Sequence, residues 1–321
     1  MARPPTATLP VGGEVAAPVS VPPGAARGPR FPLPPAAVAP APADVRPLEV
    51  PPFPSAPAHP ELTAAPPAWQ EDLFLEEALV AAVPWGLGRV AVAVRHLCTG
   101  ATAAVGAEEP MPPASIYKLG LLVACFRQIG AGRLGLEEEL LITWSDYADG
   151  AGVLQARIGE RVSVGEALRL MVRFSDNVAA QVLLRRIGVD ALNETYERLG
   201  MRHTRFFADA RPDVTTAADV AGLLVLLGTG QLAPPAASDW MLDALWQDQP
   251  ASWIEAGLPP GTVVVHKSGQ LPGIRNDAAI VYPRGGPYVL VVLTDRLSDE
   301  RAAEGLIGDL AAAAHTRLAV L

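Results

Sequence analysis

The chain has 321 residues, a formal net charge of −9 and only two lysines among its 25 basic residues. This acidic balance excludes a nucleic-acid partner, because binding to phosphates depends on a basic face. Every apolar stretch is well short of the roughly 20 residues that a spanning helix needs, so we expect no membrane span.

The first 67 residues differ in composition from the rest of the chain. They contain 20 of the 33 prolines, interleaved with alanine and valine, and no helical or alternating apolar period occurs among them. We therefore expect residues 1–67 to form a disordered Pro/Ala-rich spacer. Prolines also interrupt each early apolar run and Arg3 is the one early cation, so no signal peptide is visible. Residues 68–321 are long enough to bury a large core.

Strand-like segments lie at both ends of this second part, and helical segments lie between them. Apolar residues recur at helical spacing from Ala68 to Val83. Val90–Leu97 and Ala101–Val105 resemble strands around a Thr-Gly turn. After two prolines, a long helix is predicted to begin at Ala114 or Ser115 and to end near Ile129.

Helices with short polar connections are predicted from there to about Leu232. The remaining elements are three strands and one helix, namely Val263–His266, Ala278–Tyr282, Tyr288–Leu293 and Arg301–Leu318. The order predicts a mixed α/β fold of the α+β type: an antiparallel sheet of about five strands, built from both chain ends, flanked by helices, with an inserted all-helical lobe. We place the sheet lobe at about 68–113 and 235–321, the helical lobe at about 114–234, and a cleft between them.

Two cysteines, Cys98 and Cys125, have no spacing typical of a metal site. We expect two buried free thiols, and neither a metal nor a cofactor.

The two lysines are more informative. Arginine stays charged in any protein, whereas lysine can lose its proton when it is buried. The chain uses arginine elsewhere and lysine only at Lys118 and Lys267, which indicates that these two positions take part in proton transfer.

Lys118 closes the motif Ser115-Ile116-Tyr117-Lys118 at the predicted helix start. A spacing of three residues puts both side chains on one helix face, so the amine can reach the hydroxyl. This is a nucleophile beside a base, and the helix N-terminus favours negative charge near Ser115. The alternative for this motif alone is a serine that caps the helix.

Two further motifs follow, Ser175-Asp176-Asn177 after the amphipathic segment 164–174 and Lys267-Ser268-Gly269 at the end of a valine-rich strand. The three motifs in this order resemble the signature of the penicillin-recognising serine hydrolases, above all the class A β-lactamases. The 60-residue separation of Ser115 and Ser175 is usual in class A, and the similarity covers nearly all of residues 68–321.

The resemblance implies a role for each catalytic residue. Ser115 would be the acylated nucleophile, and Lys118 would be its activating amine. Ser175 would relay a proton to the leaving nitrogen, helped by the positive field of Lys267. The backbone N–H groups of Ser115 and Gln270 would form the oxyanion hole.

The implied substrate-binding residues are Asn177, Ser268, Gly269 and Gln270. Asn177 would hold the substrate's side-chain amide and orient the catalytic lysine, and Ser268 with its neighbouring lysine would bind a carboxylate. Arg275 is either a second carboxylate clamp, through its planar fork, or a surface cation.

Two other residues have a functional and an ordinary interpretation. Asp277 belongs either to the same site or to the surface. Tyr147 either lines the mouth of the cleft or is an ordinary aromatic of the helical lobe.

One part of the class A pattern is missing. Members carry a Glu-x-x-Leu-Asn loop after the second motif, whose glutamate activates the deacylating water. Here residues 204–213 are followed by Val214-Thr215-Thr216 about ten residues too early, without such a glutamate. Because losing a general base costs about a hundred- to ten-thousandfold, we expect acylation to survive and deacylation to be slow.

Three residues near this loop are candidates for a replacement base: His203, Asp209 and Asp213. Each has the alternative of a loop anchor or a solvated residue. Glu166 precedes the second motif on an amphipathic helix and is expected to face solvent.

Three functions stay open on this basis. The favoured one is a class A-like β-lactamase with an unusual deacylation step. The others are a D-Ala-D-Ala peptidase or penicillin-binding protein, and an acyl-trapping binder or pseudoenzyme. The resemblance implies a β-lactam or cell-wall peptide substrate, a monomer, and a periplasmic or extracellular location.

Overall fold

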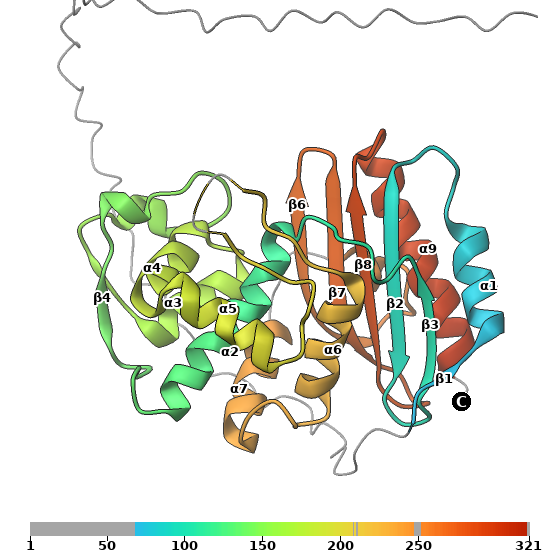
Figure 1. The fold of residues 1–321 in the computed structure, drawn as a ribbon, viewed down its shortest axis with the longest axis horizontal. Helices are drawn as coiled ribbons and strands as arrows, with labels where there is room; N and C mark the ends of the chain where they lie inside the picture. Colours follow the sequence, from blue (N-terminus) through green and yellow to red (C-terminus); the bar gives the residue numbers. More distant parts are fainter. Residues whose placement is uncertain (1–67, 208, 210, 247–251, 320–321) are drawn as a thin grey trace, which may run out of the picture. The chain divides into compact units, whose positions relative to one another are not determined.

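The computed structural model describes residues 68–207, 209, 211–246 and 252–319. The spacer predicted over residues 1–67 lies outside these described residues. The described part forms a lobe built on a β-sheet and a lobe that is mainly helical, as Figure 1 shows.

The sheet has the strand order β1-β3-β2-β8-β7-β6, which places β6 at one edge. Its strands are β1 (Gln70–Glu71), β2 (Arg89–His96), β3 (Ala101–Val105), β6 (Val263–Leu271), β7 (Ile274–Tyr282) and β8 (Tyr288–Asp295). Neighbours are antiparallel except for β1, which runs parallel to β3. The five longer strands confirm the predicted sheet from both chain ends, whereas the two-residue β1 lies where a helix was expected.

Alternate residues of the strands enter two separate cores, because successive side chains point to opposite faces of a sheet. Val264, Ala279 and Val281 face one core, and Val265 and Ile280 face the other. Hydrophobic residues on both faces explain the near-continuous apolar runs of these strands.

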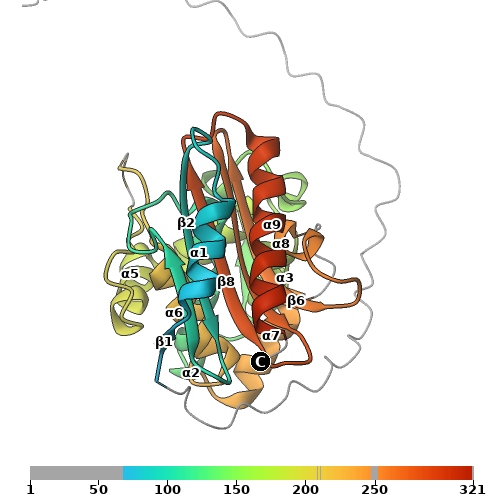
Figure 2. The same cartoon turned by 90° about the vertical axis from the view of Figure 1, so that its right-hand side faces the viewer.

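Three helices cover the first face: α1 (Leu73–Ala82), α8 (Trp253–Ala256) and α9 (Glu300–Leu318). In Figure 2, α1 and α9 lie side by side in front of the sheet. α1 begins after Asp72, whose carboxylate accepts a hydrogen bond from Leu75 N at 3.1 Å and so caps the helix.

The second face contacts α6 (Ala217–Gly228), which packs against β2, β7 and β8. This helix lies within the segment predicted for the helical lobe, although it packs directly on the sheet. α7 (Pro235–Trp246) contacts β6 and α3 and thus joins the two lobes.

The helical lobe contains α2 (Tyr117–Gly130), α3 (Val164–Arg173), α4 (Asn177–Ile187) and α5 (Val189–Arg198), and three short 3₁₀ helices, η1 (Ala114–Ile116), η2 (Trp144–Asp146) and η3 (Leu154–Arg157). It also contains a small antiparallel sheet, β4 (Glu139–Leu141) with β5 (Arg161–Ser163). An entirely helical lobe was predicted, and these two strands depart from that prediction.

Helix α2 is the centre of this lobe, since every residue from Lys118 to Phe126 is buried. Gly120 lets α5 approach closely: a Cβ at this position would lie 2.2 Å from the ring of Tyr196. The core of the lobe therefore holds the beginning of α2, and with it the first motif, in a fixed position.

Both cysteines are free, as predicted, but only Cys125 is buried, and burial raises its pKa to about 12. Cys98 is exposed, contrary to expectation, because it lies in the turn between β2 and β3.

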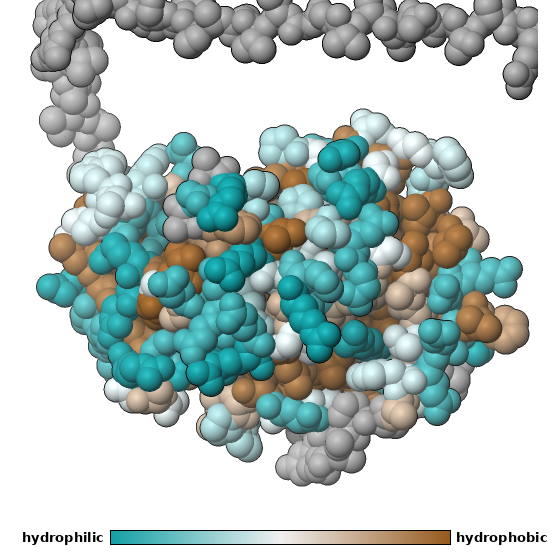
Figure 3. All heavy atoms as spheres, viewed as in Figure 1, coloured by the Kyte–Doolittle hydropathy of each residue, from teal (hydrophilic) through white to brown (hydrophobic). Residues whose placement is uncertain are grey.

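The face in Figure 3 mixes hydrophilic and apolar areas, and some of the apolar atoms lie at the right, toward α1. Leu73, Phe74 and Val80 of this helix are exposed. None of the helices among the described residues is both long and apolar enough to cross a membrane.

Candidate active site

Ser115 lies in the single turn of η1, directly before α2. It caps neither helix, because the N-cap positions belong to Pro113 and Ile116 and neither end has a side-chain cap. The interpretation of Ser115 as a helix cap is therefore wrong. The preceding residue, Ala114, has a φ of 45°, a conformation that costs energy outside glycine and that tends to occur at functional sites.

Lys118 follows one turn later, and its amine points to the second motif. The Nζ atom donates to Ser175 O at 2.5 Å, to Ser175 Oγ at 3.2 Å and to Asn177 Oδ1 at 2.7 Å. Three acceptors match the three protons of an ammonium group. The structure thus brings the first and second motifs together, and Asn177 orients Lys118 as the resemblance implied.

The expected contact between Lys118 and the hydroxyl of Ser115 is not among the hydrogen bonds of the described residues. Ser175, the residue that receives the amine instead, has a φ of 53°. Its backbone carbonyl and its hydroxyl both face Lys118. The Lys118 amine and the Ser175 hydroxyl are thus within hydrogen-bond distance of each other.

Asp176 anchors the second motif through hydrogen bonds to backbone N–H groups. One carboxylate oxygen caps α4 by accepting from Ala179 N at 2.9 Å, and the other accepts from Val153 N and Leu154 N at 2.6 and 3.0 Å. Gly152 makes room for this arrangement, since a Cβ there would lie 2.3 Å from the carboxyl carbon of Asp176.

Asn177 binds the same loop, with its Nδ2 donating to Asp149 O at 2.7 Å. The loop that carries Tyr147 is therefore tied to the site. Tyr147 itself is partly exposed and donates its hydroxyl to Asp149 at 2.9 Å. A position at the mouth of the site is compatible with these contacts and stays a prediction.

The third motif lies on the edge strand β6 and reaches the first motif through Gly269. A Cβ on this glycine would lie 2.9 Å from Ser115 N and 3.2 Å from Pro113 O. Only a glycine allows the strand to lie this close to the backbone of the nucleophile. The next residue, Gln270, is thus near the Ser115 N–H with which it is expected to form the oxyanion hole.

Asn276 holds the two segments together and was missed from the sequence. Its Nδ2 donates to Pro112 O and Pro113 O at 2.9 and 3.2 Å, and its Oδ1 accepts from Thr294 N at 2.8 Å. These bonds fix the turn before Ser115 to β7 and β8. A single asparagine in a strand gives no sequence signal for such a contact, whereas Asp176 could have been recognised as a residue that caps the next helix.

Lys267 is 1% exposed, and its Nζ donates to Ser268 O at 2.7 Å. Burial lowers the pKa of Lys267 to about 8, against the opposing effect of the Asp277 carboxylate. Asp277 is itself fully buried and accepts from Ser252 Oγ at 2.6 Å and from Ile254 N at 3.1 Å. The surface position considered for Asp277 is therefore wrong.

The charge of Lys267 affects the pKa of Lys118. Burial and the positive charge of Lys267 together lower the pKa of Lys118 to about 7, against the opposing effect of Asp176. Two buried amines that titrate near neutral pH are typical of a catalytic site rather than of a structural one.

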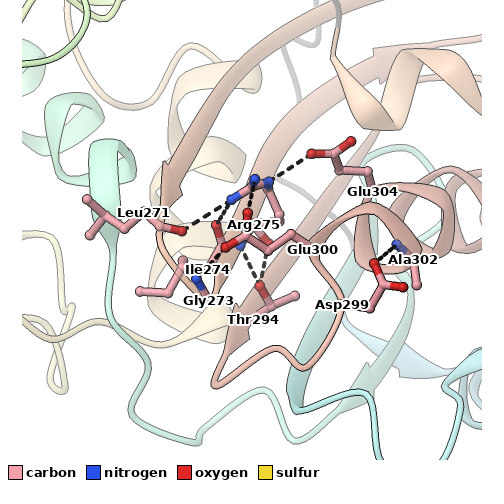
Figure 4. A network of polar contacts seen from close by, with 9 residues as sticks. All are labelled: Leu271, Gly273, Ile274, Arg275, Thr294, Asp299, Glu300, Ala302 and Glu304. Atoms are coloured by element: carbon pink, nitrogen blue, oxygen red, sulfur yellow. Dashed lines mark hydrogen bonds and ion pairs between the residues drawn. The ribbon is translucent and has the colours of Figure 1, made fainter.

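Arg275 does not form the expected carboxylate clamp. Figure 4 shows that its guanidinium points to α9, where Nε donates to Glu304 at 2.8 Å and Nη2 bonds to Glu300. Nη1 donates to the carbonyls of Leu271 and Ile274. The Arg275 guanidinium thus already forms ion pairs with two carboxylates. It is neither a free clamp nor an exposed surface residue.

Comparison with known proteins supports the geometry. A profile of the beta-lactamase enzyme family matches residues 76–318. The chain belongs to this family.

Among its curated relatives is a β-lactamase of Mycobacterium tuberculosis, 29% identical over 239 residues that cover 66% of this chain and 76% of that protein. Among solved structures, a β-lactamase of Sphaerobacter thermophilus has a TM-score of 0.71 and 27% identity, covering 77% of this chain and 97% of that one. A mutant of PBP-A, in an acyl-enzyme complex with penicillin G, has a TM-score of 0.74 and 26% identity, covering 79% and 100%. The chain is thus a serine hydrolase with the β-lactamase fold.

Within this family framework, the loop after the second motif is short. Arg205 pairs with Val214, and Met111 pairs with Thr215, so that few residues remain between the two paired segments. Asp209 lies at the exposed tip, where Arg211 lowers its pKa to about 2. His203 is exposed and lies 3.5 Å from Glu108. Neither residue has the setting of a general base.

Asp213 is the third candidate. It accepts a hydrogen bond from Phe207 N at 2.8 Å, and burial raises its pKa. Burial raises the pKa values of Tyr117 and Tyr196, and the charge of Asp213 raises them further. The hydrogen bond from Phe207 N favours the role of a loop anchor for Asp213.

Glu166 forms a partly exposed ion pair at the first turn of α3, in which its Oε1 accepts from Arg157 Nη1 at 2.7 Å. This agrees with the expectation that it is not the missing base.

Proposed function

We propose that this protein is acylated at Ser115 by β-lactam amides and that Lys118 is the base for this step. The observation that supports the proposal is the convergence of the three motifs, in which Lys118 donates to Ser175 and Asn177. Gly269 of the third motif lies against Ser115 N. Burial and the charge of Lys267 lower the pKa of Lys118 to about 7. At neutral pH a large part of Lys118 is an uncharged amine, and an uncharged amine can accept the proton of the serine hydroxyl.

The proposed step requires the Lys118 amine to meet the Ser115 hydroxyl, a contact that is not among the hydrogen bonds of the described residues. Ser115 Oγ forms a bond to the lactam carbonyl carbon while its proton passes to Lys118. The oxyanion accepts hydrogen bonds from the N–H groups of Ser115 and Gln270. The proton then moves through the Ser175 hydroxyl, 3.2 Å from Lys118 Nζ, to the lactam nitrogen as the C–N bond breaks. Lys267 supplies a positive field for the substrate's negative charge.

Deacylation is proposed to be slow. The short loop carries no residue in the position of a water-activating glutamate, and the carboxylates of Asp209 and Asp213 are bound to Arg211 and Phe207 N. After Lys118 has passed its proton to the lactam nitrogen, its uncharged amine is the group that can accept a proton from the deacylating water.

A second candidate is a D-Ala-D-Ala peptidase of the penicillin-binding type, which uses the same three motifs without the loop glutamate. The short loop favours it, as does the similarity to PBP-A. Both candidates act on compounds met outside the cytoplasm, so we propose a periplasmic or extracellular location.

A fluorescent penicillin distinguishes these functions. The protein is incubated with the compound and followed by denaturing gel and by intact mass. We expect a stoichiometric adduct that persists long after free compound is removed and that is absent from the folded Ser115→Ala variant.

Rapid loss of the adduct would contradict slow deacylation, and release of D-alanine from a D-Ala-D-Ala peptide would favour the second candidate. A folded wild-type protein that acquires no adduct would refute acylation. It would also refute the third possibility, a binder that traps the acyl group.

A further inference from the structure

The loop 147–153 lies against the second motif but has little packing of its own. It connects η2 to η3 and contains neither helix nor strand. Gly150 and Gly152 have positive φ values of 102° and 129°, and none of residues 148–152 is buried. Because apolar packing does not hold this part of the loop, its position depends on hydrogen bonds.

Gln155, the second residue of η3, supplies three of these hydrogen bonds. Its Nε2 donates to the backbone carbonyls of Ala148, Gly150 and Ala151 at 3.4, 3.3 and 3.2 Å. Three carbonyls thus share the two N–H groups of one amide. The Oε1 of Gln155 is buried and has no hydrogen-bond partner among the described residues. The side chain therefore acts on the loop through its nitrogen.

The same loop positions Asn177. Asp149 O accepts from Asn177 Nδ2 at 2.7 Å, and Ala151 O accepts from Asn177 N at 3.0 Å. A Cβ on Gly150 would lie 2.8 Å from Asn177 Nδ2, so the loop backbone is close to this amide. With its nitrogen bound to the loop, the amide presents Oδ1 to Lys118 Nζ at 2.7 Å.

The position of the loop therefore decides which end of the Asn177 amide faces Lys118. If Asp149 O moved away, the amide could rotate and turn its NH₂ group toward the lysine. An NH₂ group is a donor only and cannot accept a hydrogen bond from an ammonium group. The amine would then lose one of its three acceptors.

We propose that Gln155 is a positioning residue for acylation, because it holds the loop 147–153 so that Asn177 fixes the direction of the Lys118 amine. The inference rests on the proposed acylation at Ser115. Gln155 acts through the loop and Asn177.

Replacing Gln155 by methionine tests this role. Methionine has a similar length and volume, so it fills the same space, but it has no N–H donor. It is also uncharged, so the charges of Lys267 and Asp176, which act on Lys118, stay as they are. Gln231→Met, at an exposed position between α6 and α7, is the matched control.

The second-order rate constant of acylation by a fluorescent penicillin is measured from pH 5.5 to 9, from time courses with the compound in excess. Such time courses report on the folded molecules alone, even where a variant is partly unfolded. We expect Gln155→Met to lower the highest rate constant about tenfold, the scale of one or two lost hydrogen bonds.

The pH profile separates positioning from a loss of stability. The rise of the rate near pH 7 should move to lower pH by about half a unit to one unit in Gln155→Met, because the charged form of Lys118 loses an acceptor. A loss of stability alone would leave the position of this rise unchanged. Gln231→Met should change neither the rate nor the profile.

A double-mutant cycle tests the route through Asn177. If Gln155 acts through Asn177, the double variant Gln155→Met with Asn177→Ala should be acylated within about twofold of the rate of Asn177→Ala alone. A double variant that is tenfold slower than Asn177→Ala would overturn the inference, since Gln155 would then act by another route.

An unchanged rate in Gln155→Met, or a lower rate with an unmoved pH profile, would also overturn the inference while leaving acylation at Ser115 intact. A folded wild-type protein that the penicillin does not acylate would instead refute the proposed function, and the positioning role with it.

Discussion

Replacing Lys118 by arginine tests the role of the uncharged amine. Arginine keeps the positive charge and much of the length, and it can still donate to Ser175 and Asn177. It cannot lose a proton in a protein, so it cannot act as a base. The variant therefore separates proton transfer from charge and hydrogen bonding.

The expected loss can be worked from the pKa of Lys118. With a pKa of about 7, half of the amine is uncharged at pH 7. At the ordinary value of 10.5 the uncharged fraction would be about three in ten thousand. Burial beside Lys267 thus raises the reactive fraction by roughly a thousandfold. We expect Lys118→Arg to reduce acylation by at least this factor.

The assay is the second-order rate constant of labelling by a fluorescent penicillin between pH 5.5 and 9. In the wild type the rate should rise through about pH 7, as Lys118 loses its proton, and fall above about pH 8, as Lys267 loses its charge. Arg127→Lys, an exposed exchange on the same helix, is the control. A Lys118→Arg variant that keeps a tenth of the wild-type rate, or a flat wild-type profile from pH 6 to 8, would refute the reasoning.

Two other substitutions test the framework of the site. Gly269→Ala should slow acylation about a hundredfold, because the new Cβ would lie 2.9 Å from Ser115 N and displace the nucleophile; Gly305→Ala, with no atom in contact range, should leave labelling unchanged. Asp176→Ala should lower the free energy of unfolding in urea by about 2–4 kcal/mol, because three backbone N–H groups lose their acceptor. The exposed Asp239→Ala should cost under about 0.5 kcal/mol, and equal effects of the two would contradict the anchoring role of Asp176.

Much of the fold was readable from the sequence because its elements are long and periodic. The strand Ala101–Val105 has the predicted bounds, and the helix that ends at Leu318 begins one residue before its predicted start. Strands β6 and β7 extend beyond the valine-rich runs to Leu271 and Ile274. The polar ends of these strands contain the site residues. Because these residues are not apolar, the sequence pattern did not show that they belong to strands.

The site was readable only in part. The three motifs converge, as predicted from their order, but local spacing could not show how they meet. Spacing suggested that Lys118 bonds to Ser115, whereas its partners come from 57 and 59 residues away. The bonds of Asn276 and the pairing of Arg275 with α9 likewise depend on tertiary contacts that no local pattern records.

The left-handed backbone at Ala114 and Ser175 has a consequence for how this enzyme can evolve. Each such residue costs about 1–2 kcal/mol relative to an ordinary turn. The bonds from Asn276 to Pro113 and from Lys118 to Ser175 compensate for this cost during folding, before any substrate arrives. Mutations that relax either position would make the protein more heat-resistant and less active, so selection for thermal robustness and selection for turnover oppose each other at these two residues.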